Sequence, residues 1–170
     1  MANCRHRYRG AADTKSNRFL LVAVDTFTKF VVIKAVRSAT AKVVTEFIKN
    51  DVVLKFACRE IIVSDNGVQY KSNEFKSFAE AKGITLWYTA NYFAQGNPSE
   101  CVNATIGNAL RTFLVNDTDH RKWDKKIPEI ANAINNSVHT GTGCMPYEAN
   151  FGQKMAQHAS EYRRSIDANE

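Results

Sequence analysis

The strongest constraint on the fold is the segment at residues 19–24, FLLVAV, in which six apolar residues follow one another. A strand with one face in water alternates between apolar and polar residues, whereas a strand buried on both faces is apolar throughout. Residues 19–36 hold two apolar runs that break near Asp25 and Thr26, which predicts a hairpin of two strands with the first in the centre of a sheet. Because residues 13–17 have turn composition, we expect an earlier strand at about 5–12 to pair with it.

Shorter apolar segments predict the remaining elements. Helical spacing at 40–57 indicates a long helix, and Ile61–Val63 and Leu86–Tyr88 are expected to be strands. Ser72 and Gly83 are placed to begin and end a helix between those two strands. Two further helices are predicted, one beginning at Asn97 and Pro98 and one over 121–137. The chain is thus expected to form one domain, 1–170, with a core at about 5–153, a tail at 154–170 and a mixed α/β sheet flanked by helices.

Composition excludes several classes of protein. The 170 residues suit a single domain. The sequence contains no stretch of 18 apolar residues that could form a membrane span. The N-terminal segment lacks the apolar run of a signal peptide, so we expect a location in the nucleus or cytoplasm. The net charge of +6 is compatible with binding a polyanion without proving it.

The cysteines and histidines do not predict a zinc site. The chain has four of each, dispersed and without a CxxC pair. We therefore expect the cysteines to be buried or half-buried free thiols. They are Cys4, Cys58, Cys101 and Cys144.

Two acidic residues stand where catalytic carboxylates often occur. Asp65 follows the strand at 61–63, and ligands of open α/β sheets bind at the carboxyl ends of strands. Glu100 lies in the first turn of the helix after the loop 91–97. Each residue also has a purely structural explanation, because Asp65-Asn-Gly can close a turn and Glu100 can cap the helix through Asn97.

Four segments in this order resemble the integrase catalytic core of gypsy-like LTR retrotransposons and retroviruses. They are LLVAVDTFTKF at 20–30, the Asp65 segment at 61–70, the Glu100 segment at 92–103 and the segment TGTGCMPYEANFG at 140–152. The resemblance runs from about residue 7 to 162 and implies a ribonuclease-H-like fold with a five-stranded mixed sheet. It also implies that three carboxylates hold two Mg²⁺ ions for in-line attack on a DNA phosphodiester. Asp65 corresponds to the second carboxylate and Glu100 to the third.

The first carboxylate is missing from its expected position. The family pattern Asp-x-x-Gly-Pro aligns its glycine with Gly10, which puts Arg7 where the aspartate should stand. Asp13 lies in the expected turn and Asp25 at the far end of the next strand, so neither is a convincing substitute. The family is also commonly basic at the positions of Cys101 and Ala104, and has proline at Ala94. We name Tyr92, Gln95 and Asn103 as candidate DNA-contacting residues, and expect Trp87 and Tyr88 to pack in the core.

These observations lead to a hypothesis with two rivals. The hypothesis is a domesticated or degenerate integrase core, catalytically inactive, that acts as a homodimeric interaction or scaffolding module for an unidentified protein partner and binds nucleic acid weakly. It needs no cofactor. One rival is an active, Mg²⁺-dependent DNA strand transferase, and the other is a DNA-binding domain without chemistry. The family resemblance implies dimerisation through the helices at 40–57 and 121–137, with Trp123 and Lys126 as interface positions.

Overall fold

The computed structural model describes residues 2–7, 17–89, 98–115 and 120–155, with side chains over 17–89, 102–112 and 123–155. Five strands form one sheet in the order β3-β2-β1-β4-β5. They are β1 (Ala2–Arg7), β2 (Phe19–Val24), β3 (Val31–Val36), β4 (Ile61–Ser64) and β5 (Thr85–Tyr88). The pairs β1–β2 and β2–β3 are antiparallel, while β1–β4 and β4–β5 are parallel. The predicted mixed sheet is confirmed. Its first strand, expected at about 5–12, already begins at Ala2, and residues 8–12 lie outside the described ranges.

The helices begin close to the residues that the sequence predicts. The segment expected at 40–57 is one continuous helical stretch, made of α1 (Ala41–Phe47), the π-helical η1 (Ile48–Val53) and α2 (Leu54–Phe56). Helix α3 (Asn73–Ala81) is capped by Ser72, whose Oγ accepts a 3.2 Å hydrogen bond from the amide of Phe75. It ends where Gly83 adopts a left-handed φ of +66°, which favours glycine.

The second half of the described chain is helical. It contains α4 (Pro98–Val115), the 3₁₀ helix η3 (His120–Lys126), α5 (Ile127–Asn135) and α6 (Pro146–Phe151). The helix predicted at 121–137 is therefore divided at residue 127. Pro128 explains the division, because it has no amide hydrogen to continue an α-helical ladder from η3.

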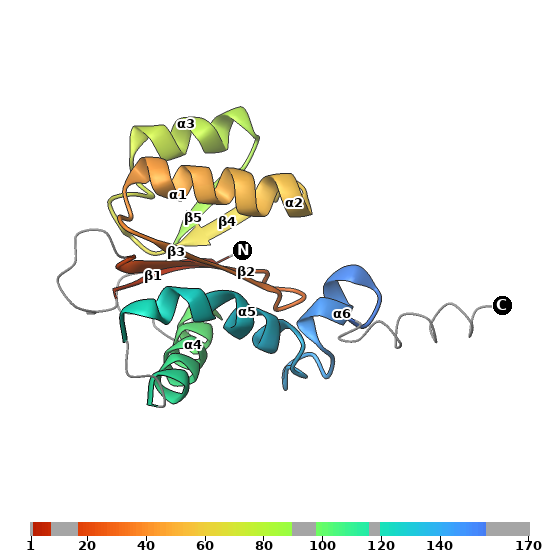
Figure 1. Cartoon of the computed structure of the whole chain (residues 1–170). Coiled ribbons are helices and arrows are strands. Elements are labelled where there is room, and N and C mark those ends of the chain that lie inside the picture. Colours follow the sequence, from red (N-terminus) through yellow and green to blue (C-terminus); the bar gives the residue numbers. More distant parts are fainter. Residues whose placement is uncertain (1, 8–16, 90–97, 116–119, 156–170) are drawn as a thin grey trace.

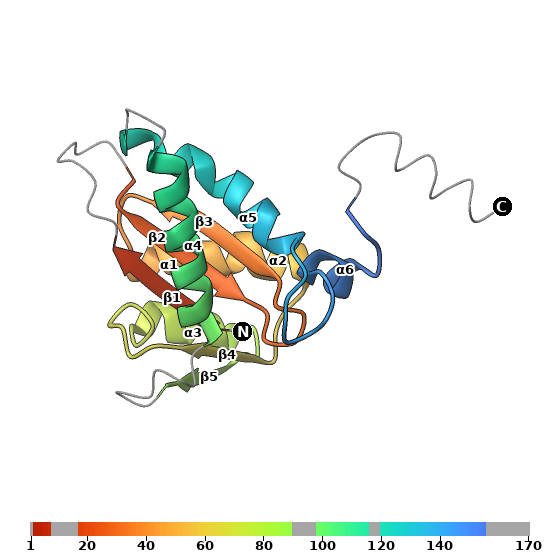
Figure 2. The same cartoon turned by 90° about the horizontal axis from the view of Figure 1, so that it is seen from below.

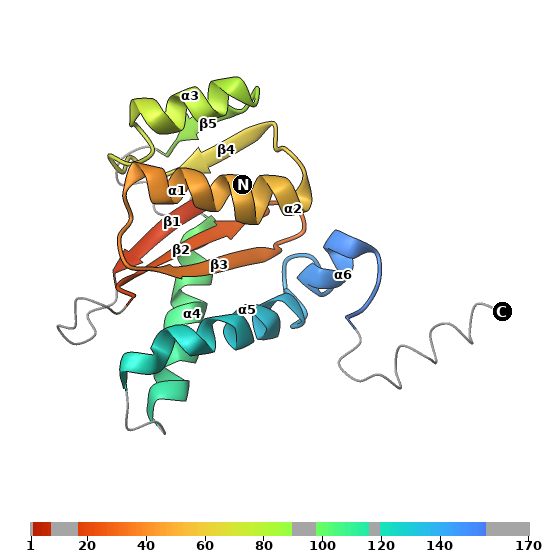
Figure 3. The ribbon, with the colours of Figure 1, turned by 45° about the horizontal axis from the view of Figure 1, so that its top comes forward.

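The sheet lies between two layers of helices (Figure 1 and Figure 3). One face is covered by α1, η1 and α3, and the other by α4 and α5, with α4 against β1 and β2 and α5 against β3 (Figure 2). Alternate residues of β2 enter the two apolar cores, Leu21 and Ala23 on the α1–α3 side and Leu20, Val22 and Val24 on the α4–α5 side. The apolar run at 19–24 is thus buried on both faces, as predicted.

Trp123 belongs to the core of the monomer. Its side chain is only 4% exposed and packs in the cluster that β2 forms with α4 and α5. The expectation that Trp123 lies at a dimer interface is therefore wrong. The error arose because helical spacing identifies an apolar residue without telling which neighbour covers it.

The outer edge of β3 is partly covered by a side-chain amide. Val31 donates its backbone amide to Oδ1 of Asn135 at 2.8 Å, and Nδ2 of Asn135 donates to the carbonyl oxygen of Val31 at 2.9 Å. Asn135, the last residue of α5, is 6% exposed. It gives Val31 the two hydrogen bonds that a further strand would otherwise supply.

Two other expectations concern cysteines and membrane spans. Cys58 is exposed, which corrects the expectation that it is buried, whereas Cys144 is partly buried as expected. The side chains of Cys4 and Cys101 lie outside the described set. Within the described ranges, no helix combines the length and apolar character needed to cross a bilayer.

A carboxylate on η1 makes stability depend on pH. Asp51 lies 2.6 Å from Nζ of Lys34 and 2.9 Å from Nζ of Lys55. Burial raises the pKa of Asp51, but the two lysines outweigh it, so the pKa lies below the ordinary value of 3.8. A lowered folded-state pKa stabilises the fold above 3.8, and that stabilisation is lost as pH falls through the folded-state pKa.

We expect Asp51→Asn to lower the free energy of unfolding at neutral pH by less than about 1 kcal/mol, because both lysines are half-exposed. The difference from the unmodified protein should shrink below pH 3.8. Urea unfolding across the pH range measures it, with Glu129→Gln, from the exposed Lys126–Glu129 pair, as the control. A difference that grows in acid would contradict this assignment.

Candidate metal site at the carboxyl end of β4

Asp65 directly follows β4 and organises the turn that it begins. Its Oδ1 accepts a 2.9 Å hydrogen bond from the amide of Gly67, and the carbonyl of Gly67 accepts one from Tyr70 at 3.0 Å. The turn interpretation of Asp65-Asn-Gly is therefore correct. It does not exclude a second role, because a carboxylate has two oxygens and several acceptor positions.

Gly67 lies close to the side chains of two neighbours. A Cβ atom at this position would lie 2.5 Å from Nε2 of Gln69 and 2.8 Å from Oδ1 of Asp65. A larger residue would therefore have to displace both the carboxylate of Asp65 and the side chain of Gln69, which is 5% exposed. A substitution at Gly67 is thus expected to move the Asp65 carboxylate.

Asn66 joins the turn to the neighbouring strand. Its Nδ2 donates to the carbonyl of Thr89 at 2.6 Å, and the amide of Thr89 donates to the carbonyl of Ser64 at 2.9 Å. Thr89 is the last described residue before 98, where α4 begins. Glu100 lies in the first turn of α4, as predicted, and its side chain is outside the described set.

The β1–β4 ladder shows which residue of β1 is level with Asp65. Ala2 is opposite Val63 and Asn3 is opposite Ser64, so the next step along the two parallel strands brings Cys4 level with Asp65. Arg7 lies three residues further on, opposite Phe19 of β2, which is roughly 10 Å along the strand. The motif pattern thus places the lost carboxylate at Arg7, whereas the ladder places it at Cys4. Strand β1, ANCRHR, contains no acidic residue at either position.

Asp25 has a structural role at the opposite end of the strands. Its Oδ1 accepts from the amide of Phe27 at 3.0 Å, and its Oδ2 lies 3.4 Å from Nη2 of Arg59. Arg59 precedes β4 and Asp65 follows it, so this ion pair places Asp25 near the start of β4, at the other end of that strand from the Asp65 turn. The expectation that Asp25 does not replace the missing carboxylate stays a prediction. Asp13 lies outside the described residues.

Only one of the three candidate DNA-contacting side chains is described. Asn103 is half-buried on α4, while Tyr92 and Gln95, with Ala94, lie in the segment 90–97 that the structure does not describe. Ala104 is exposed on α4, so the position where the family is commonly basic presents a methyl group to solvent. This part of the site therefore remains a prediction from the sequence.

Trp87 was misplaced by sequence reasoning. It is 57% exposed on the edge strand β5, two residues before Thr89, whereas Tyr88 packs against the α1–α3 core and donates its hydroxyl to the carbonyl of Tyr70 at 3.0 Å. The expectation of core packing holds for Tyr88 and is wrong for Trp87. Four residues of an edge strand are too few for their alternation to show which face is covered.

The family comparison and the relatives agree on one assignment. The family model described as "Integrase core domain" matches residues 8–92. The chain is 27% identical over 140 residues to the Pro-Pol polyprotein of Simian foamy virus type 1, and 27% identical over 131 residues to the Transposon Tf2-3 polyprotein of Schizosaccharomyces pombe. These alignments cover 81% and 76% of this chain but only 12% and 10% of the polyproteins.

Solved integrase structures share the fold. The HTLV-2 integrase catalytic core domain in complex with magnesium has a TM-score of 0.69 at 20% identity, covering 88% of this chain and 93% of that one. The simian T-cell lymphotropic virus intasome in complex with PP2A regulatory subunit B56 gamma has a TM-score of 0.75 at 17% identity, covering 91% of this chain and 55% of that one. With the five-stranded mixed sheet and the Asp65 turn, these matches establish that the chain belongs to the integrase core family.

Proposed function

We propose that this chain is a degenerate or domesticated integrase core that no longer joins DNA and acts as a dimeric protein-interaction or scaffolding module. One observation carries the loss of catalysis: β1, the strand between β2 and β4, has no acidic residue from Ala2 to Arg7. Weak, sequence-independent nucleic-acid binding accompanies this role, since a net charge of +6 attracts phosphates without specifying bases. The module is proposed to act in the nucleus or cytoplasm.

The residues present fit a pair of Mg²⁺ ions poorly. Mg²⁺ prefers oxygen ligands, and Asp65 and Glu100 are the two that the family pattern retains. A thiol from Cys4 would be a soft ligand, and a guanidinium from Arg7 would add a permanent positive charge. Mg²⁺ bound by Asp65 and Glu100 would supply Lewis-acid chemistry, but two ions would share too few carboxylates.

DNA joining by the full chain tests the proposal. We expect no 3′-processing and no strand transfer with Mg²⁺ or Mn²⁺, and no Mg²⁺ binding in the millimolar range by isothermal titration. Metal-dependent joining that Glu100→Gln abolishes would overturn the proposal. In that case the chain would be an active strand transferase, the rival function that the intact Asp65 turn and its closely packed Gly67 favour.

Two matched variants identify the lost ligand position. The β1–β4 ladder predicts that Cys4→Asp gains Mg²⁺ binding and that Arg7→Asp does not. The motif pattern anchored on Gly10 predicts the reverse. Titration of both variants with Mg²⁺, against the unmodified chain, therefore decides between the two alignments, whatever the activity of either variant.

A further inference from the structure

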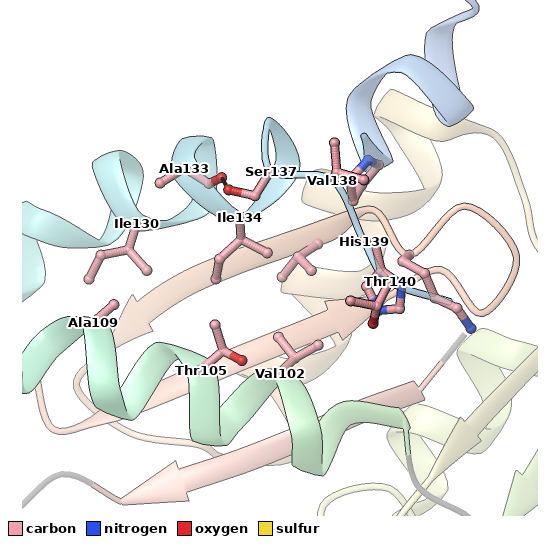
Figure 4. A pocket seen from close by; sticks show the side chains of 13 residues that line it. Val102, Thr105, Ala109, Ile130, Ala133, Ile134, Ser137, Val138, His139 and Thr140 are labelled. Atoms are coloured by element: carbon pink, nitrogen blue, oxygen red, sulfur yellow. Dashed lines mark hydrogen bonds between the residues drawn. The ribbon is translucent and has the colours of Figure 1, made fainter. Parts of the chain in front are cut away.

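A cavity lies between α4 and α5, away from the Asp65 turn. Its volume of about 410 Å³ is within the usual range for small-molecule sites, roughly 300–1,000 Å³. Val102 and Ala109 of α4 face Ile130 and Ile134 of α5 across it (Figure 4). Its rim is accessible to solvent, because Val138 is 61% exposed. An apolar ligand could therefore enter without opening the core.

Hydrogen-bond donors lie at one end of the cavity. His139 and Thr140 lie together at one end, beyond Val102 (Figure 4), and Lys29 also lines the cavity. Nδ1 of His139 accepts a 3.1 Å hydrogen bond from the amide of Gly141, so a neutral imidazole carries its hydrogen on Nε2 and can donate. A Cβ at Gly141 would lie 3.3 Å from the imidazole ring, so a larger residue there would have to shift the ring slightly.

The charge of the cavity is one-sided. Among the described residues that line the cavity, Lys29 is the only one with a permanent charge, and none of these residues is acidic. The ammonium of Lys29 donates to the carbonyl of Thr26 at 2.6 Å, which uses one of its three hydrogens. An anionic acceptor is therefore complementary to this cavity, whereas a cationic group would meet like charge.

Lys29 also occupies a backbone conformation that disfavours side chains. Its φ of 64° lies in the left-handed region, where a residue other than glycine costs about 1–2 kcal/mol. Strained positions of this kind occur at binding sites, and at Lys29 the conformation also closes the β2–β3 turn, where the Lys29 amide donates to the carbonyl of Asp25 at 2.9 Å. The strain and the one-sided charge are separate observations, and both concern the same residue.

We infer that this cavity binds a small amphipathic carboxylate, with its apolar body between α4 and α5 and its carboxylate at Lys29 and His139. The site is separate from the Asp65 turn and does not depend on whether the chain joins DNA. The medium-chain fatty acid decanoate is a suitable probe, because it pairs an apolar chain with one carboxylate.

Titrating the full chain with decanoate, decanol and decyltrimethylammonium tests the inference. Backbone amide chemical shifts should change at lining residues such as Thr105, Ala133 and Val138, and decanoate should bind at least about tenfold more tightly than decanol. The cationic probe should bind weakest. Equal affinity for decanoate and decanol, or shift changes spread over the whole surface, would overturn the inference.

Three variants separate binding from folding. Lys29→Gly removes the ammonium and relieves the left-handed strain, so it should weaken decanoate binding about tenfold without lowering stability. Ala133→Phe should fill the mouth of the cavity and block all three probes, because Ala133 is exposed at the rim. Lys125→Ala removes an exposed lysine elsewhere and should change nothing. Unchanged decanoate affinity in Lys29→Gly would contradict the site.

Discussion

Replacing Trp123 with alanine is expected to lower the free energy of unfolding by about 3–5 kcal/mol. The indole is 4% exposed in the α4–α5 core, among Leu110, Ile127 and Ile130. Its removal would leave a cavity that the rigid sheet and the two helices cannot close. Urea unfolding measures the loss, and the loss should be the same at low and high protein concentration because the contacts lie within one chain.

A surface variant from the same region provides the control. Lys126 pairs with the exposed Glu129, so Lys126→Ala should change stability by no more than about 0.5 kcal/mol. A different result would show that Trp123 lies at a dimer interface. In that case Trp123→Ala would be as stable as the unmodified protein, and a dimer seen by light scattering would become a monomer.

Replacing Asn135 with leucine should cost about 2–4 kcal/mol. The substitution leaves the amide and the carbonyl of Val31 without the side-chain amide that now binds both, and each buried unpaired group costs about 1–3 kcal/mol. Asn132→Leu is the control, since Asn132 is exposed on the same helix. Equal stability of the two variants in urea would show that the Asn135 amide contributes nothing.

Asn135→Asp tests the geometry of this contact further. An ionised carboxylate only accepts, so it would repel the carbonyl of Val31, whereas a protonated one can both donate and accept. The variant should therefore be destabilised at neutral pH and recover part of its stability in acid. Recovery is expected from Asn135→Asp and not from Asn135→Leu.

Local patterns predicted much of the fold. The run at 19–24 required a strand buried on both faces, and Ser72 and Gly83 marked the ends of α3 because caps act through neighbouring backbone groups. The position of Asp65 after β4 followed from the same local reasoning.

The features that the sequence did not predict depend on contacts between residues far apart in the chain. The length of β1 and its register against β4 depend on contacts some 60 residues apart, which no short motif encodes. For the same reason, sequence spacing identified Trp123 and Trp87 as apolar positions but not which one the fold covers. The cavity at Lys29 was also missed. Its lining comes from the β2–β3 turn, two helices and the loop at 137–146, and only a backbone angle marks Lys29 as unusual.

The division of the core between the two faces of the sheet has a consequence for synthesis on the ribosome. On the α1–α3 face, helix α1 begins to cover β2 after roughly 20 more residues, whereas Leu20, Val22 and Val24 meet Ile106 and Leu110 only after roughly 80 more residues have been made. At about 5–20 residues per second, that apolar strip stays uncovered for several seconds. A nascent chain halted before α4 should therefore bind chaperones, and one extended through α5 should release them.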